Sequence, residues 1–143
     1  MNQELRAAIA KVGMLLSDIT GGFWYIEAPA EISEPYAVFS FLPSSYSRDT
    51  ASKFEEHYLQ INLYDVDGSN AEDLAKQIIN IFEDSEGAII MPNYVCIAID
   101  RQLMRNAKLD DVFQITIQYK IQLSEGYMSR IADFSTVEHL TGA

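Results

Sequence analysis

Residues 54–82 read FEEHYLQINLYDVDGSNAEDLAKQIINIF, and this stretch decides the fold. In its first half Leu59, Ile61 and Leu63 alternate with polar residues, which is the period of a strand buried on one face. In its second half the apolar residues recur at helical spacing and form one stripe: Ala71, Leu74, Ala75, Ile78 and Phe82. The sequence therefore predicts a half-buried strand followed by an amphipathic helix that covers a sheet.

A turn separates these two predicted elements. Residues 65–68 (DVDG) are turn formers, and Ser69 with Glu72 has the spacing of a capping box, in which both side chains satisfy backbone N–H groups of the first helical turn. The segment superficially resembles a calcium loop, but an EF-hand needs glycine at its sixth position, and Gly68 stands at the fourth. We therefore expect a turn and a helix cap without a metal.

The bulk composition predicts one globular domain. The chain has 143 residues, of which 48% are hydrophobic and 22% charged. Its N-terminus lacks the basic and apolar regions of a signal peptide, so we expect a protein made in the cytoplasm. The one cysteine, Cys96, excludes an internal disulfide and is expected to be a small buried hydrophobe. We predict a single α+β domain over residues 1–143.

The charge balance is strongly acidic. The formal net charge is −11, from 21 acidic and 10 basic residues. Nucleic-acid binders gain affinity by neutralising phosphates with clustered Lys and Arg, and no such cluster occurs here. Sequence-specific DNA recognition is therefore not expected. The acidic surface favours solubility, and the alternative is an acidic channel wall along which DNA slides.

Both ends of the chain show helical spacing. The pattern predicts a helix from about residue 2 to 18 that ends before Gly21 and Gly22. Gly13 inside it lowers helix propensity, which implies close packing against another element. Residues 124–143 are expected to form a C-terminal arm or a short helix.

The remaining regular segments read as strands. Strands are predicted at 23–26, at 94–104 and at 35–43, where the apolar pattern indicates a central strand. In 113–123 every odd residue is apolar and every even residue is polar. Because this strand is long, we expect part of it to project beyond the sheet or to pair with a neighbour. The sheet should be mostly antiparallel, flanked by the N-terminal helix and the central amphipathic helix.

Few residues suggest a reacting group. His57 and His139 are not flanked by a glycine-rich turn or a nucleophile elbow, so we expect no catalytic role for them. The paired acids at 55–56 and 110–111 are expected to be solvated charges. Walker, dinucleotide-binding and zinc spacings do not occur. We therefore predict no catalytic, cofactor-binding or metal-binding residues and no enzyme activity.

One face of the predicted strands is polar but almost uncharged. Tyr58 and Tyr64 share it with Gln60 and Asn62, and the even residues of 114–122 add a row of Gln and Thr broken only by a lysine. Tyrosine is enriched at protein interfaces, where its ring is buried and its hydroxyl stays hydrated. This surface can face solvent or another subunit.

The order and spacing of the elements resemble the tail terminator or tail completion family of long-tailed bacteriophages, which are neck proteins. The resemblance covers most of the chain and is carried by four segments: PYAVF (35–39), LQINLYD (59–65), AEDLAKQI (71–78) and FQITIQY (113–119). Family members often have an arginine and a Gly-Thr-His-like turn before the last strand. Residues 101–111 contain two arginines but not that turn, so a terminator, an adjacent head–tail joining protein and a subunit of a tail-like device all remain open.

The resemblance implies an α+β subunit that assembles into a ring, commonly a hexamer. In the family the ring caps the finished tail tube, stops its polymerisation and provides the surface for head attachment, without catalysis. The implied partners are further copies of the chain, the tail-tube protein and the head–tail connector protein, with DNA only passing through the ring and no membrane. The implied location is the host cytoplasm during assembly and then the virion.

A ring subunit must present two different patches that fit one another. We expect contacts in two predicted polar loops, 44–53 and 104–111, because binding residues are commonly placed on loops. The candidate interface residues are Tyr46, Arg48, Asp49, Lys53, Arg101, Arg105, Lys108 and Asp110. Two alternatives are a monomeric adaptor that binds a peptide at a free sheet edge and an enzyme with a small-molecule pocket under the aromatic strand at 23–26.

Overall fold

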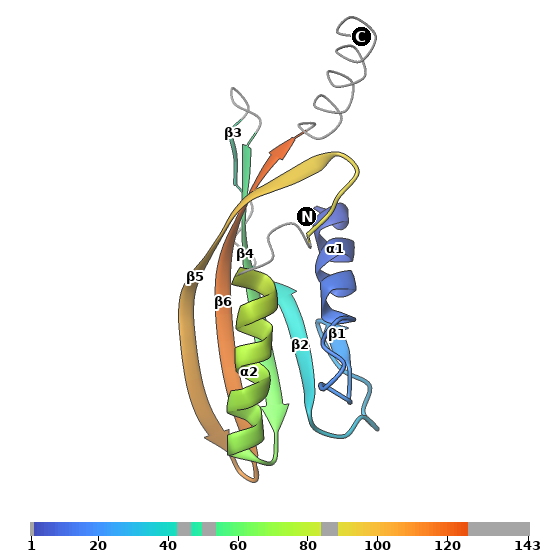
Figure 1. Cartoon of the computed structure of the whole chain (residues 1–143), viewed down its shortest axis with the longest axis vertical. Helices are drawn as coiled ribbons and strands as arrows, with labels where there is room; N and C mark the ends of the chain where they lie inside the picture. The colour runs from blue at the N-terminus through green and yellow to red at the C-terminus, as the bar shows by residue number, and fades with distance from the viewer. Residues whose placement is uncertain (1, 43–46, 50–53, 84–88, 126–143) are drawn as a thin grey trace, which may run out of the picture.

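Two helices and six strands make up the part of the chain that the computed structural model describes, residues 2–42, 47–49, 54–83 and 89–125. In chain order they are α1 (Gln3–Gly13), β1 (Phe23–Tyr25), β2 (Tyr36–Phe41), β3 (Ser47–Asp49), β4 (Phe54–Asp65), α2 (Gly68–Glu83), β5 (Tyr94–Leu109) and β6 (Val112–Glu125). The strands form one sheet in the order β1-β2-β4-β6-β5, with β3 paired to β4 (Figure 1). The predicted α+β class is confirmed.

The sheet is antiparallel except where β1 runs parallel to β2. Its central strand β4 pairs with β6 from Phe54 opposite Ser124 to Asp65 opposite Phe113. β2 lies between β1 and β4, so the prediction of an inner strand at 35–43 is confirmed. β6 is paired along its length with β4 on one side and β5 on the other. Of the two alternatives expected for this long strand, pairing with a neighbour holds for the described residues and projection beyond the sheet does not.

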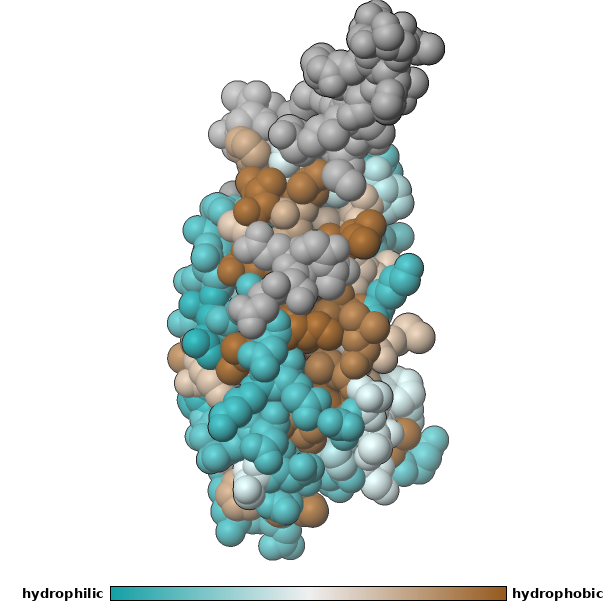
Figure 2. Space-filling model, viewed as in Figure 1, coloured by the Kyte–Doolittle hydropathy of each residue, from teal (hydrophilic) through white to brown (hydrophobic). Residues whose placement is uncertain are grey.

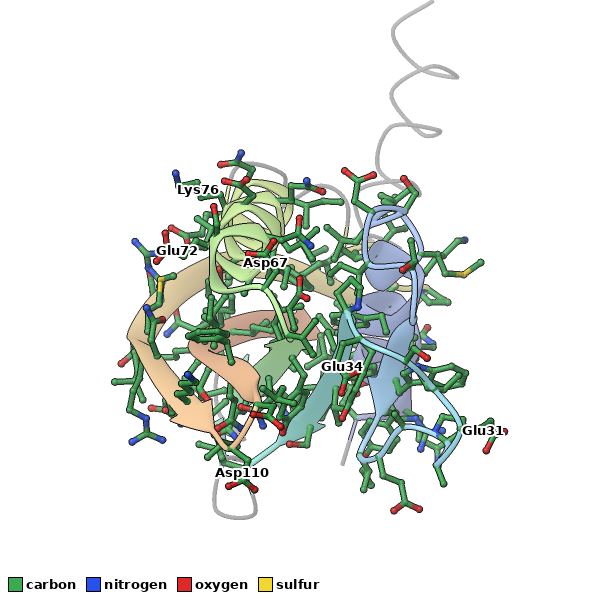
Figure 3. All side chains as sticks on the ribbon, turned by 90° about the horizontal axis from the view of Figure 1, so that it is seen from below. Glu31, Glu34, Asp67, Glu72, Lys76 and Asp110 are labelled. Atoms are coloured by element: carbon green, nitrogen blue, oxygen red, sulfur yellow. The ribbon has the colours of Figure 1, made fainter. Side chains whose placement is uncertain are left out.

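Both helices lie on the same face of the sheet, with α1 beside β1 and α2 over β4, β6 and β5 (Figures 1 and 3). The predicted stripe of α2 is buried in full. It packs in one core with inward residues of the two central strands, among them Leu59, Ile61, Leu63, Ile115 and Ile117. Hydrophilic side chains cover the outside of α2, and apolar ones gather between the two helices (Figure 2). The opposite face of the sheet carries no helix among the described residues.

α1 is shorter than its apolar spacing predicts. It begins after the N-cap Asn2 and ends at Gly13, not near residue 18. A β-carbon on Gly13 would clash with the Phe23 ring, so only glycine allows the helix to approach β1 this closely. Tight turns follow, yet Leu16 and Ile19 remain buried, which is why the apolar spacing continues past the helix. The expected close packing at Gly13 is confirmed.

The N-terminal cap of α2 is also displaced from its predicted position. The helix begins at Gly68, and the Asp67 carboxylate accepts hydrogen bonds from the backbone N–H groups of Ser69 (3.0 Å) and Asn70 (3.3 Å). Ser69 is therefore inside the helix, and the predicted capping box with Glu72 is wrong. Aspartate caps helices as well as serine does, so the local sequence offers two competing caps.

The largest difference from prediction lies in β5. The expected strand at 94–104 and loop at 104–111 are one strand of 16 residues, joined to β6 by the turn Asp110-Asp111. Register shifts between Cys96 and Ala98 and between Arg101 and Leu103 each insert one extra residue. Such β-bulges reverse the side-chain alternation, so a strand with two of them has no continuous period of two. The other expected loop, 44–53, contains the short strand β3.

The predicted arm at 124–143 lies outside the described residues, except for the last two residues of β6. No helix within the described ranges is long and apolar enough to span a membrane.

Candidate functional site

Four of the eight candidate interface residues lie on the hairpin of β5 and β6. Arg101, Arg105 and Lys108 are on β5, and Asp110 is in the turn with a positive φ of 52°. All four side chains are exposed. β5 forms one edge of the sheet; among the described residues it pairs with β6 and makes one further bridge, between Val95 and Ile90. These residues therefore lie on an open sheet edge and not on a loop.

The three cations of β5 do not share one face. Residues directly opposite one another in a β-ladder point to the same side of the sheet. Arg101 is opposite Tyr119 and Lys108 is opposite Phe113, so both lie on the face that carries the helices. Arg105 is opposite Thr116, on the helix-free face. The edge thus presents positive charge on both of its sides.

Arg101 takes part in a cluster at the C-terminal end of α2. Its Nε lies 3.5 Å from Oε2 of Glu83, and the same carboxylate oxygen accepts a hydrogen bond of 2.9 Å from the Tyr119 hydroxyl. Burial and the neighbouring Glu83 carboxylate raise the pKa of Tyr119, so its hydroxyl stays protonated and donates. The cluster fixes β5 to α2 at the point where one of the bulges lies.

Lys108 borders a cavity of about 270 Å³ between the start of α2 and the β5–β6 hairpin. Its ammonium lies 5.4 Å from the centre of the Phe113 ring, a cation–π distance. The alternative function predicted from the sequence, an enzyme, requires a pocket under residues 23–26, away from this cavity. Phe23 in that segment stacks on Phe39 and Phe82 within the core. The aromatic strand is therefore packed and does not line this cavity.

The helix-free face carries a ladder of polar side chains between β4 and β6. Cross-strand hydrogen bonds link Gln114 to Tyr64 (3.1 Å), Thr116 to Asn62 (2.7 Å), Gln118 to Gln60 (2.8 Å) and Gln122 to Glu56 (3.2 Å). Lys120 pairs with Glu56 at 3.4 Å, so the charges on this ladder are matched. The predicted polar, nearly uncharged face is confirmed.

The remaining four candidate residues lie in the 44–53 region. Arg48 and Asp49 belong to β3, where Arg48 is opposite Glu55 and Asp49 is opposite Phe54 in the ladder. Tyr46 and Lys53 lie outside the described residues. In the described part of the chain, this group extends the β4 end of the sheet and is separate from the cations of β5.

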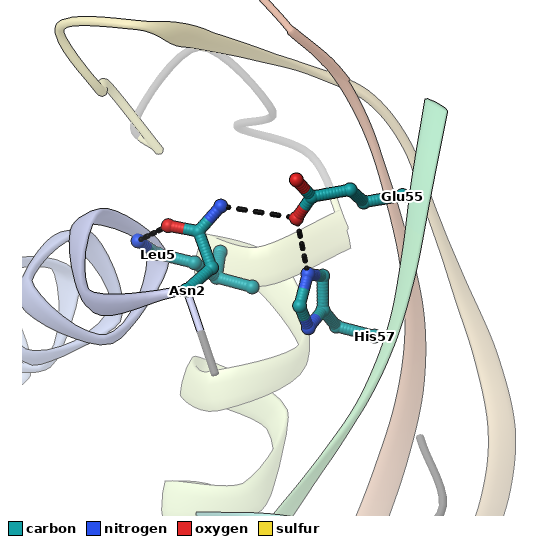
Figure 4. A network of polar contacts seen from close by, with 4 residues as sticks. All are labelled: Asn2, Leu5, Glu55 and His57. Carbon is teal, nitrogen blue, oxygen red and sulfur yellow. Dashed lines mark hydrogen bonds and ion pairs between the residues drawn. The ribbon is translucent and has the colours of Figure 1, made fainter. Parts of the chain in front are cut away.

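A buried polar network at the start of α1 was not predicted from the sequence. Glu55 and His57 are both buried, and the His57 Nε2 donates to the Glu55 carboxylate at 2.9 Å (Figure 4). Asn2 donates to the same oxygen at 3.2 Å while its own oxygen caps Leu5 N. Burial raises the pKa of Glu55, but the His57 and Asn2 hydrogen bonds outweigh it and lower the pKa overall.

The expectation that Glu55 is a solvated charge is therefore wrong. Glu55 lies two residues before His57 on the inward face of β4. This spacing was the available signal, because Glu55, His57 and Leu59 then point to the same side of the strand. Cys96 is partly buried against the core, close to its expected role. Among the described residues, no group of three or more His, Cys, Asp or Glu side chains is placed to hold a metal.

The fold and these surfaces define a class of protein: an α+β sheet subunit with an open, charged edge strand and a separate polar face. The chain belongs to the family of the tail completion protein gp17, whose model matches residues 3–124. It is accordingly a structural protein of phage-type tails.

Comparison with solved structures agrees on the fold. A chain from the virion of a native gene transfer agent particle superposes with a TM-score of 0.60 at 15% identity, covering 87% of this chain and 90% of that one. A second solved chain has a TM-score of 0.50 at 20% identity, covering 85% and 96%. No curated protein sequence matches the chain.

Proposed function

We propose that this protein forms a hexameric ring that caps the tail tube, ends tail polymerisation and provides the surface for head attachment. The observation that carries the proposal is the match to the tail completion family over residues 3–124. The fold likeness to a chain of a gene transfer agent virion supports it. The partners are then other copies of the chain, the tail-tube protein and the head–tail connector protein. Assembly takes place in the host cytoplasm, and the ring remains in the neck of the virion.

The role requires contacts and no reaction. A ring that closes uses two different patches on each subunit, so that every subunit meets its neighbours head to tail. The open β5 edge is one candidate for such a patch, and the β3–β4 end of the sheet is a separate surface for a different partner. Arg48, Arg105, Lys108 and Asp110 remain our candidate contact residues.

Passage of DNA through the ring is compatible with the charge of the chain. DNA adheres where Lys and Arg neutralise phosphates, and the net charge here is −11. On the helix-free face the polar ladder contains one Lys–Glu pair, Lys120 with Glu56, and otherwise mostly uncharged amides and hydroxyls. Such a wall attracts DNA weakly, which suits a conduit.

The test is the mass of the purified protein in solution over a concentration series, with negative-stain images of the same samples. Closed rings of about six subunits are expected. If the protein is a monomer at every concentration, the measurement is repeated with cognate tail-tube protein, because a terminator can close on the tube tip. Monomers that also fail to bind tail-tube protein would contradict the proposal.

A monomeric adaptor is the second candidate function, because one observation favours it. β5 is an edge strand whose outer side pairs with no described strand from Ile97 to Leu109, and extended peptides add to such edges through backbone hydrogen bonds. The adaptor hypothesis predicts a monomer that binds a peptide and forms no ring on tail tubes. The same mass and binding experiment therefore separates the two functions.

A further inference from the structure

The β5 edge has the features of a surface that is covered in an assembly. From Ile97 onward its outer side pairs with no described strand, and such edges promote unwanted pairing unless they are protected. Charged side chains can provide that protection, and β5 has three cations. It also exposes Leu103, Met104 and Leu109, which protection alone does not explain. Mixed apolar and basic side chains are typical of a contact surface.

The opposite edge of the sheet carries the complementary features. Met14 is 80% exposed and Ile26 is 62% exposed, and Leu15 beside Met14 is also exposed. All three flank β1, because Gly13 contacts the Phe23 ring and Ile26 follows Tyr25. The β1–β2 connection next to them, residues 26–35, contains three glutamates and no basic residue. We call this surface the β1 side.

The two surfaces lie on opposite sides of one subunit. The strand order places β5 and β1 at the two ends of the main strand path of the sheet. Figure 3, seen from below, shows Glu31 projecting from the β1 side, across the molecule from β5. Glu27 and Glu31 are exposed there, and Arg105 and Lys108 are exposed on β5. A head-to-tail contact between copies can therefore use both surfaces at once.

Charge selects this arrangement over the alternatives. At a net charge of −11, two copies repel at most relative orientations. Contact between two β5 edges would bring the cations of both copies together, and a symmetric contact of that kind closes a dimer, not a ring. A head-to-tail contact that sets Arg105 and Lys108 against Glu27 and Glu31 brings opposite charges together; each surface also carries charge of the other sign, with Asp100 and Asp110 on the β5 hairpin and Arg6 over the Tyr25 ring on the β1 side. Electrostatic complementarity of this kind fixes which surfaces meet.

We propose that the β5 edge of one subunit docks on the β1 side of the next copy of this chain, with Arg105 and Lys108 facing Glu27 and Glu31 and apolar residues between them. The proposed contact rests on the proposed function and adds to it the two surfaces that close the ring. Arg101 contributes less, because Glu83 of its own chain already holds it.

The experiment is a charge swap. One variant, Arg105→Glu with Lys108→Glu, makes the β5 edge acidic; the other, Glu27→Lys with Glu31→Lys, makes the β1 side basic. Each alone should assemble at concentrations at least about 100-fold higher than the unchanged protein, because like charges then face each other. An equal mixture should regain assembly in rings where the two variants alternate, since every junction again joins opposite charges.

Matched controls lie on the exposed face of α2. Asp73→Lys reverses one acid, and Lys76→Glu with Asn80→Glu adds negative charge; these three exposed residues are not among those that line the cavity beside Lys108. Both controls should assemble like the unchanged protein. Circular dichroism and thermal unfolding verify that each swapped variant is folded, and the rescue in the mixture requires folded subunits in any case.

The outcomes separate the inference from the proposed function. Rings formed by both swapped variants at unchanged concentrations would overturn the proposed contact and leave the ring itself intact. Loss of assembly in each variant without rescue in the mixture would also overturn the pairing of these two surfaces. An unchanged protein that forms no ring, alone or with tail-tube protein, would contradict the proposed function together with the contact.

Discussion

At the scale of single residues, Glu55 shows what burial does to a charged side chain in this fold. It is 2% exposed, and it receives hydrogen bonds from His57 on its own strand and from Asn2 at the start of α1. An ionised carboxylate is stable in such a place only because these donors replace water. The network joins the start of α1 to β4 through hydrogen bonds.

This network makes the stability of the protein depend on pH. The pKa of Glu55 is lowered from its ordinary value of 4.5, so its ionised form stabilises the fold above about pH 4.5. That contribution is lost as the pH falls through the lower pKa of the folded state. Glu55→Gln should reduce the free energy of unfolding near neutral pH by about 1.5–3 kcal/mol, measured by urea denaturation.

The loss should shrink as the pH is lowered, because the unchanged protein then loses its own ionised Glu55. Glu56→Gln is the matched control, since Glu56 is partly exposed on the other face and its pair with Lys120 is worth less than about 1 kcal/mol. A difference between Glu55→Gln and the unchanged protein that stays constant down to acidic pH would contradict the assigned role.

Gly13 is a second residue whose role depends on its surroundings. Gly13→Ala in an ordinary helix is stabilising, because alanine has the higher helix propensity. Here the added methyl group would meet the Phe23 ring, so we expect a loss of about 1–3 kcal/mol in the free energy of unfolding. Combining Gly13→Ala with Phe23→Leu should recover part of the loss. A more stable Gly13→Ala variant would show that the helix does not approach β1 so closely.

At the scale of whole elements, the segments that were predicted well are those with one buried face and no irregularity. β4, α2 and β6 keep one period along their length, so Leu59, Leu74 and Ile117 are where the pattern places them. β5 was predicted poorly because it has two bulges and, as an edge strand, seven consecutive exposed residues from Asp100 to Asn106. A period cannot be seen where neither face is uniformly buried.

The cap of α2 is the element-scale test. Asp67 accepts two backbone hydrogen bonds at the start of the helix, whereas Ser69 is inside it. Asp67→Ala should lower the free energy of unfolding by about 1 kcal/mol, and Ser69→Ala should change it by less than about 0.5 kcal/mol. Thermal or urea unfolding of the two variants side by side measures this. A larger loss for Ser69→Ala than for Asp67→Ala would contradict the Asp67 cap and support the capping box predicted from the sequence.

At the scale of the whole molecule, the candidate site could be predicted only in part. Arg105 and Lys108 were chosen from the sequence because they fall in the expected contact loop at 104–111, which in the structure is the end of β5 and the turn after it. The β1 side was not identified from the sequence, because Met14, Ile26 and Glu31 are brought to one side of the subunit by the packing of α1 on β1 and the path of the β1–β2 connection. Surfaces built from several elements have no local sequence pattern. Their recognition required the folded chain.

The central claim is that this protein ends tail growth, and the most direct measurement of it follows tube length. Cognate tail-tube protein is allowed to polymerise with and without the purified chain, and electron microscopy records the length of the tubes and what stands at their tips. We predict that growth stops on addition of the protein and that each stopped tube carries a ring at one tip. Tubes that continue to grow at the same rate, with bare tips, would contradict the account.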